Sequence, residues 1–197
     1  MNTYYQTPAI VLTMRDEREA DRIITFYTRD FGKIKTLARG VRHIKSKLRG
    51  HIVPGALVRI AFVEGKESLH LVDGEILYNP LRKLSPTTFS PSAPSYGAYF
   101  KGEITRDSPL RVRGTRDTQV SLVGVTIAQA IHFLDRVTGE RERDEELWRF
   151  LMHWFLEPKE NFLAFQASTL SILGFLPRDT KISEQQIHAA LAANHLT

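Results

Sequence analysis

The N-terminal part of the chain contains short apolar runs of the length expected for β-strands. These runs are rich in β-branched, aliphatic and aromatic side chains, which favour strands, and Gly-containing turn signals separate several of them. Five short strands joined by short turns are typical of a small barrel, and a five-stranded oligonucleotide-binding (OB) barrel is the natural candidate. The runs occupy residues 9–14, 22–28, 33–41, 57–63 and 69–78.

The third run alternates in side-chain character. Lys33, Lys35 and Arg39 fall on one face of the predicted strand. Successive side chains of a strand point to opposite faces, so the intervening residues can pack inside a barrel while this face presents cations. The intervening residues are Ile34, Thr36, Ala38 and Gly40.

Beyond residue 120 the pattern becomes helical. Apolar residues recur every three or four positions, as they do on the buried face of a helix. Gly139, Pro158 and Gly174 mark helix ends, and Ser183 followed by Gln186 is a capping-box signature for a last helix. Several helices are therefore predicted in this part of the chain.

Prolines interrupt the stretch between these two parts, where no helical period survives. We predict an α+β protein with an OB barrel over residues 1–79 and an α-helical domain over 120–197. Residues 80–119 are expected to be an irregular, Pro-rich linker or an insertion.

Composition narrows the class of protein. The chain is 42% hydrophobic and 25% charged, a balance typical of globular proteins. It has no cysteine, which excludes disulfides and cysteine-ligated zinc. No apolar run approaches the roughly 20 residues that span a bilayer, so we expect a cytoplasmic protein with no membrane contact.

The positive charge is concentrated in one segment. The formal net charge is +5, yet residues 29–49 alone contain eight basic residues and one acidic residue, Asp30. A field this local favours a polyanionic partner, and lysine and arginine bind phosphates without reading sequence. The predicted DNA-binding residues are Lys33, Lys35, Arg39, Arg42, Lys45, Lys47 and Arg49.

Aromatic side chains on a barrel can stack exposed bases. Tyr4, Tyr27 and Phe31 are the candidates for exposed stacking positions, whereas Phe26 and Phe62 are expected in the core because apolar residues flank them.

Enzyme motifs are lacking in the sequence, which has no G-x-G-x-x-G, G-x-S-x-G or H-E-x-x-H pattern. An acidic cluster at Asp16, Glu19 and Asp21 would suit Mg²⁺ in a nuclease, but interleaved arginines make local ion pairing the more economical interpretation. We predict no catalytic residue. A metal-dependent nuclease, an RNA-binding or translation-associated OB protein, and a structural scaffold remain as alternatives.

Several short motifs follow one another in a specific order, at residues 9–12, Arg15, Glu19, 21–23, 31–33, 38–40, 45–50 and 65–66. In this order they resemble the N-terminal domain of the RecO family, and the likeness covers residues 4–78. A weaker likeness continues at 134–136 and 173–177.

The resemblance implies an OB domain followed by a helical domain, acting in recombinational repair at the nucleoid. It implies binding of single- and double-stranded DNA and annealing of complementary strands. It also implies loading of the RecA recombinase with the partner RecR, and recruitment by the acidic, apolar C-terminal tail of single-stranded-DNA-binding protein. For that tail, an apolar groove in the helical domain with Arg136 nearby is the expected site.

The chain differs from many RecO proteins in its lack of metal-binding cysteines. Many members of the family that this chain resembles carry zinc-binding cysteines after a Gly-Phe-x-Pro turn. Here the turn at residues 174–177 is followed by Arg178 and by no cysteine. We therefore expect no zinc and no other cofactor.

Overall fold

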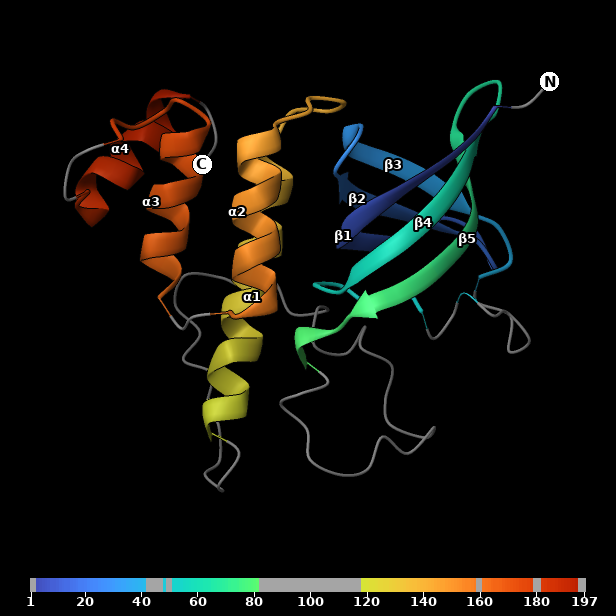
Figure 1. Cartoon of the computed structure of the whole chain (residues 1–197), viewed down its shortest axis with the longest axis horizontal. Coiled ribbons are helices and arrows are strands. Elements are labelled where there is room, and N and C mark those ends of the chain that lie inside the picture. Colours follow the sequence, from blue (N-terminus) through green and yellow to red (C-terminus); the bar gives the residue numbers. More distant parts are fainter. Residues whose placement is uncertain are drawn as a thin grey trace.

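The computed structural model describes residues 3–41, 48, 51–81, 118–158, 161–178 and 182–194. Within these residues, five strands come first and four helices follow. This order confirms the predicted α+β class (Figure 1).

The strands form a closed barrel in the order β1-β2-β3-β5-β4. Neighbouring strands are antiparallel except β3 and β5, which run parallel where Thr36 lies opposite Leu69. The first strand closes the barrel because it is long enough to pair with β4 through its first half and with β2 through its second half. The five-stranded OB barrel is confirmed. Its strands are β1 (Tyr4–Asp16), β2 (Arg22–Thr28), β3 (Gly32–Ala38), β4 (Leu57–Glu64) and β5 (Leu69–Tyr78).

Strand β1 is buried on both faces. Ala9 and Val11 point into the barrel interior, where Phe26 and Phe62 also lie, as predicted. Ile10 and Leu12 instead belong to a second apolar cluster, which they share with the helices. A strand covered on both sides needs apolar residues at every position, which explains the continuous apolar run at residues 9–12.

The helices are α1 (Thr118–Val137), α2 (Glu145–Leu156), α3 (Phe162–Ile172) and α4 (Glu184–Ala193). Asp144 caps α2 by accepting a hydrogen bond from the Leu147 amide at 2.8 Å. The predicted capping box of the last helix is confirmed, with Ser183 and Gln186 bonded reciprocally. Helices α1 and α2 stand beside the barrel, and α3 and α4 lie on their far side (Figure 1).

The contact between barrel and helices is apolar and continuous. Tyr27 of β2 stacks on Trp148 of α2, with ring centroids 6.5 Å apart and an interplanar angle of 24°. Leu57 of β4 joins the same cluster, together with Leu134 of α1. Burial of an aromatic or leucine side chain contributes roughly 1.5–3 kcal/mol, so this contact stabilises the arrangement of the two parts.

The predicted linker over residues 80–119 lies outside the described residues, apart from residues 80, 81 and the first two of α1. The domain boundaries therefore stay a prediction. Across the described ranges, no helix is both long enough and apolar enough to cross a membrane.

Candidate nucleic-acid interface

Lys33 does not present its charge to solvent. It is 7% exposed, and its Nζ donates to the backbone carbonyl of Asp135 in α1 at 2.5 Å. The Asp135 carboxylate lies 3.7 Å from the same Nζ. The expectation that Lys33 belongs to an open cationic face is wrong, because the end of α1 covers this position of β3.

The loop between α1 and α2 continues this cover along β3. The Arg141 amide donates to the Lys33 carbonyl at 2.8 Å, and Glu140 forms a parallel bridge with Lys33. Gly32 has a φ of +64°, and a Cβ added there would overlap the backbone carbonyl of Glu142. Glycine is required at this position both by the backbone conformation and by the close approach of the loop.

Lys35 lies on the same side of β3 but remains open to solvent. Its ammonium group forms a hydrogen-bonded ion pair with the Glu140 carboxylate, and the two side chains are 55% and 61% exposed. The hydrogen bond from Lys35 lowers the pKa of the Glu140 carboxyl, and the charges of Lys33 and Arg141 act in the same direction. Lys35 is therefore accessible but already paired.

Arg39 has different surroundings. It is exposed and directly follows β3, and within the described part of the chain it makes no ion pair. The turn after it is fixed by Gly40, which has a φ of +63° and whose amide donates to Asp21 Oδ1 at 2.8 Å. From residue 39 to residue 50 the chain contains no acidic residue. The other predicted DNA-binding residues, Arg42, Lys45, Lys47 and Arg49, lie outside the described residues.

Several other arginines of the barrel are neutralised by neighbouring carboxylates. Among the described residues of the barrel, the charge of these arginines is therefore held in local ion pairs. The pairs are Arg22 with Asp16 at 2.7 Å, Arg29 with Asp30 at 3.0 Å and Arg59 with Glu75 at 3.1 Å.

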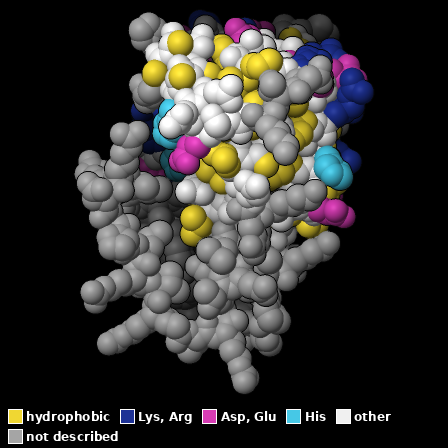
Figure 2. Space-filling view, turned by 90° about the vertical axis from the view of Figure 1, so that its left-hand side faces the viewer, with side chains coloured by type: hydrophobic (Ala, Val, Ile, Leu, Met, Phe, Trp, Pro, Cys, Tyr) yellow, Lys and Arg dark blue, Asp and Glu magenta, His cyan; other side chains and the backbone are white. Residues whose placement is uncertain are grey.

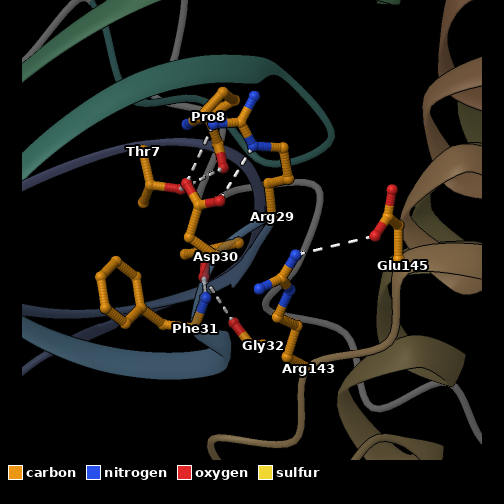
Figure 3. A network of polar contacts seen from close by, with 9 residues as sticks. Thr7, Pro8, Arg29, Asp30, Phe31, Gly32, Arg143 and Glu145 are labelled. Carbon is orange, nitrogen blue, oxygen red and sulfur yellow. Dashed lines mark hydrogen bonds and ion pairs between the residues drawn. The ribbon is translucent and has the colours of Figure 1, made fainter.

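The turn between β2 and β3 is tied to β1 through Asp30. This carboxylate accepts a hydrogen bond from Thr7 Oγ1 at 2.7 Å and from Arg29 Nε at 3.0 Å (Figure 3). The hydrogen bond from Arg29 lowers the pKa of the Asp30 carboxyl most strongly, and the bond from Thr7 lowers it further. Arg143, in the loop before α2, lies beside this turn and directs its guanidinium toward Glu145. Charged groups of alternating sign therefore line the seam between barrel and helices.

The aromatic candidates are found in three different environments. Tyr4 is 57% exposed and remains available for stacking. Tyr27 is 1% exposed, so the expectation of an exposed ring is wrong at this position, because α2 covers it. Phe31 is half-buried and contacts Tyr5 and Phe62 edge-on. Tyr5 lies beside this group and is stacked on Phe62, with ring centroids 5.3 Å apart and an interplanar angle of 25°.

The acidic cluster near β1 has structural partners. Asp16 binds Arg22, and Asp21 accepts from the Gly40 amide. Among the described residues, no group of three His, Asp or Glu side chains is arranged to hold a metal ion. The ion-pairing interpretation is therefore supported at Asp16, whereas Asp21 binds the backbone of the turn after β3.

A pocket with a volume of about 550 Å³ lies along α3 in the helical part. Small and apolar side chains line it, including Leu163, Ala164 and Ile172. Its basic lining residue is Arg178, which pairs with Glu146 at 3.1 Å, whereas the expected Arg136 is exposed and does not line it. Figure 2 views the molecule from the side of α3 and α4 and shows hydrophobic side chains spread over the described part of this face.

Comparison with known proteins shows which proteins the chain resembles. Residues 1–79 match the family model described as "Recombination protein O N terminal". The chain is 24% identical over 180 residues to the DNA repair protein RecO of Thermodesulfovibrio yellowstonii, covering 88% of this chain and 59% of that protein. The chain is therefore similar to RecO proteins, most specifically over its N-terminal barrel. This confirms the resemblance on which the function was predicted.

Other relatives share the name and differ in how much of them is matched. The DNA repair protein RecO of Bifidobacterium longum subsp. infantis is 28% identical over 149 residues, 75% of this chain and 48% of the relative. That of Bifidobacterium adolescentis is 42% identical over 62 residues, 32% of this chain and 25% of the relative. The chain thus spans between a quarter and about three fifths of the length of these relatives.

Proposed function

We propose that this protein is a member of the RecO family that binds DNA without cutting it and acts in recombinational repair as a strand-annealing mediator. The observation that carries the proposal is the position of Arg39. The barrel holds it exposed at the end of β3, where a segment with five basic residues and no acidic residue begins. The relatives, named DNA repair protein RecO, support a role in DNA repair.

The proposed mechanism is electrostatic. Arg39, Arg42, Lys45, Lys47 and Arg49 neutralise backbone phosphates, and release of condensed counterions supplies the binding free energy. Because these contacts are made to phosphates, single- and double-stranded DNA are both bound. Neutralising the phosphates of two strands on one protein lowers the repulsion that slows their pairing. Tyr4, which is exposed, is the favoured side chain for stacking an unpaired base.

The partner proposals rest on the family resemblance. We propose that the protein works with RecR to load the recombinase at the nucleoid. The acidic, apolar tail of single-stranded-DNA-binding protein is proposed to enter the pocket along α3, where Arg178 replaces Arg136 as the expected cation. A tail peptide that fails to bind in a titration, or that binds equally well after Arg178→Ala, contradicts this assignment.

The DNA-binding proposal is tested by fluorescence anisotropy of a labelled single strand at several salt concentrations. If about six phosphates are neutralised, log affinity falls against log salt with a slope near −4. The variant Arg39→Ala/Arg42→Ala should bind more weakly with a slope shallower by about 1.4. Binding that ignores salt, or an unchanged variant, would favour a purely structural scaffold.

Two further outcomes separate the remaining rivals. RNA and DNA present the same phosphates, so electrostatic attraction alone does not distinguish the two ligands. Stronger binding to structured RNA than to single-stranded DNA would therefore favour an RNA-binding protein. Magnesium-dependent cleavage of the oligonucleotide that Asp21→Ala abolishes would favour the nuclease. Under the present proposal, the protein instead accelerates annealing of complementary strands.

A further inference from the structure

The pair between Lys35 and Glu140 joins two parts of the chain that are 105 residues apart in sequence. Both side chains are more than half exposed, so the pair is open to other ions in solution. The neighbouring Lys33 differs, because its ammonium group is buried and donates to a backbone carbonyl. An ion in solution can therefore compete at Lys35 but not at Lys33.

The loop that presents Glu140 is held in place without this pair. The Arg141 amide binds the Lys33 carbonyl, and Arg141 itself takes a left-handed conformation with a φ of 59°. The close approach of Glu142 to Gly32 fixes the same loop from its other side. Because these contacts are made by backbone atoms, the loop would keep its place when the Glu140 carboxylate leaves Lys35.

Lys35 lies close to the segment proposed to bind DNA. It precedes Arg39, which directly follows β3, by four positions, so the two residues are at most about 14 Å apart along the chain. Both residues are exposed. A DNA strand that follows the basic segment back toward β3 therefore meets a lysine whose charge is occupied by a carboxylate.

We propose that Glu140 occupies the place of a DNA phosphate on Lys35, and that bound DNA must displace it. The inference rests on the proposed DNA binding and adds a regulatory contact to it. The anionic loop lowers affinity for DNA strands and leaves one cationic position closed until a strand competes for it. Phosphate and carboxylate both accept charge-assisted hydrogen bonds from an ammonium group, so a phosphate can replace the Glu140 carboxylate on Lys35.

The test compares Glu140→Gln with Glu75→Gln in single-strand anisotropy titrations. Each change removes one exposed carboxylate from an ion pair, Glu140 from Lys35 and Glu75 from Arg59. Glu75→Gln therefore reports the effect of removing one negative charge from an exposed ion pair elsewhere on the barrel. We expect Glu140→Gln to raise affinity about 2- to 5-fold above the control, the range expected for releasing an exposed ion pair. Equal affinities for the two variants overturn the inference.

A double-mutant cycle places the effect at Lys35. If Glu140 acts by occupying this lysine, Glu140→Gln should have no effect on affinity in a Lys35→Gln background. A gain that persists without Lys35 overturns the inference while leaving DNA binding intact. Wild-type protein that fails to bind DNA at all overturns both the inference and the proposed function, so the two failures are distinguishable.

Discussion

The two ends of β3 carry basic residues of the same predicted role in opposite surroundings. At its start, Lys33 is buried beneath α1 and bonded to Asp135, and Gly32 is in close contact with the α1–α2 loop. At its end, Arg39 is exposed and no ion pair to it is seen among the described residues. The comparison teaches that a run of basic residues can serve two purposes. Its first part holds the helices on the barrel, and its remainder begins at an exposed arginine that we propose binds a polyanion.

The largest effect is expected from a substitution at the start of β3, where the α1–α2 loop packs against the strand. Gly32→Ala forces a side chain into the left-handed region and against the backbone of Glu142, and we expect it to lower the free energy of unfolding by roughly 3 kcal/mol. Gly174→Ala is the matched control, since Gly174 also has a positive φ but nothing lies within 4 Å of its added Cβ. It should cost only about 1 kcal/mol. Urea unfolding of both variants measures the difference, and equal costs would mean that the loop contact is unimportant.

The next test concerns the buried lysine. Lys33→Met keeps the length of the side chain and removes a charge-assisted hydrogen bond to Asp135, so stability should fall by about 2 kcal/mol. Arg39→Ala, at the open end, should change stability by less than about 0.5 kcal/mol. Thermal unfolding of the two variants side by side checks this. If Arg39→Ala is destabilised and Lys33→Met is as stable as the wild type, the structural role assigned to Lys33 is wrong.

A smaller effect is expected at the turn that leads into β3. Asp30→Asn weakens the bonds from Thr7 and Arg29 and should cost about 1 kcal/mol at neutral pH. The folded protein holds the pKa of Asp30 below its value in the unfolded chain, so the stabilisation is complete above that unfolded value. The gap between wild type and variant should therefore shrink below about pH 4. A gap that stays constant through this range in pH-dependent unfolding would show that the ionised carboxylate is not responsible.

The strands and helices were predictable because their signals are local. Alternation in the strands, glycine at the turns and the Ser183 cap each depend on neighbours a few residues away, and the structure confirms the elements they indicated. The bounds differ at the ends, for example in β1, which begins at Tyr4 rather than at residue 9. There the edge of β4 supplies partners that the apolar run alone does not reveal.

The cover over Lys33 and Tyr27 was not predictable from neighbours. Asp135 is 102 residues from Lys33 in sequence, and alternation shows that a side chain points outward without showing what lies outside. One signal pointed to the cover. Residues 9–12 are apolar on both faces of β1, a pattern typical of a strand packed on both sides.

The most direct test of the divided basic run is a salt titration of single-strand binding for Lys33→Met and Arg39→Ala beside the wild type. The account predicts that Lys33→Met keeps the wild-type affinity and salt slope, because its ammonium group never contacts DNA. Arg39→Ala should lose about fivefold in affinity, with a slope shallower by about 0.7. A shallower slope for Lys33→Met together with an unchanged Arg39→Ala would contradict the account.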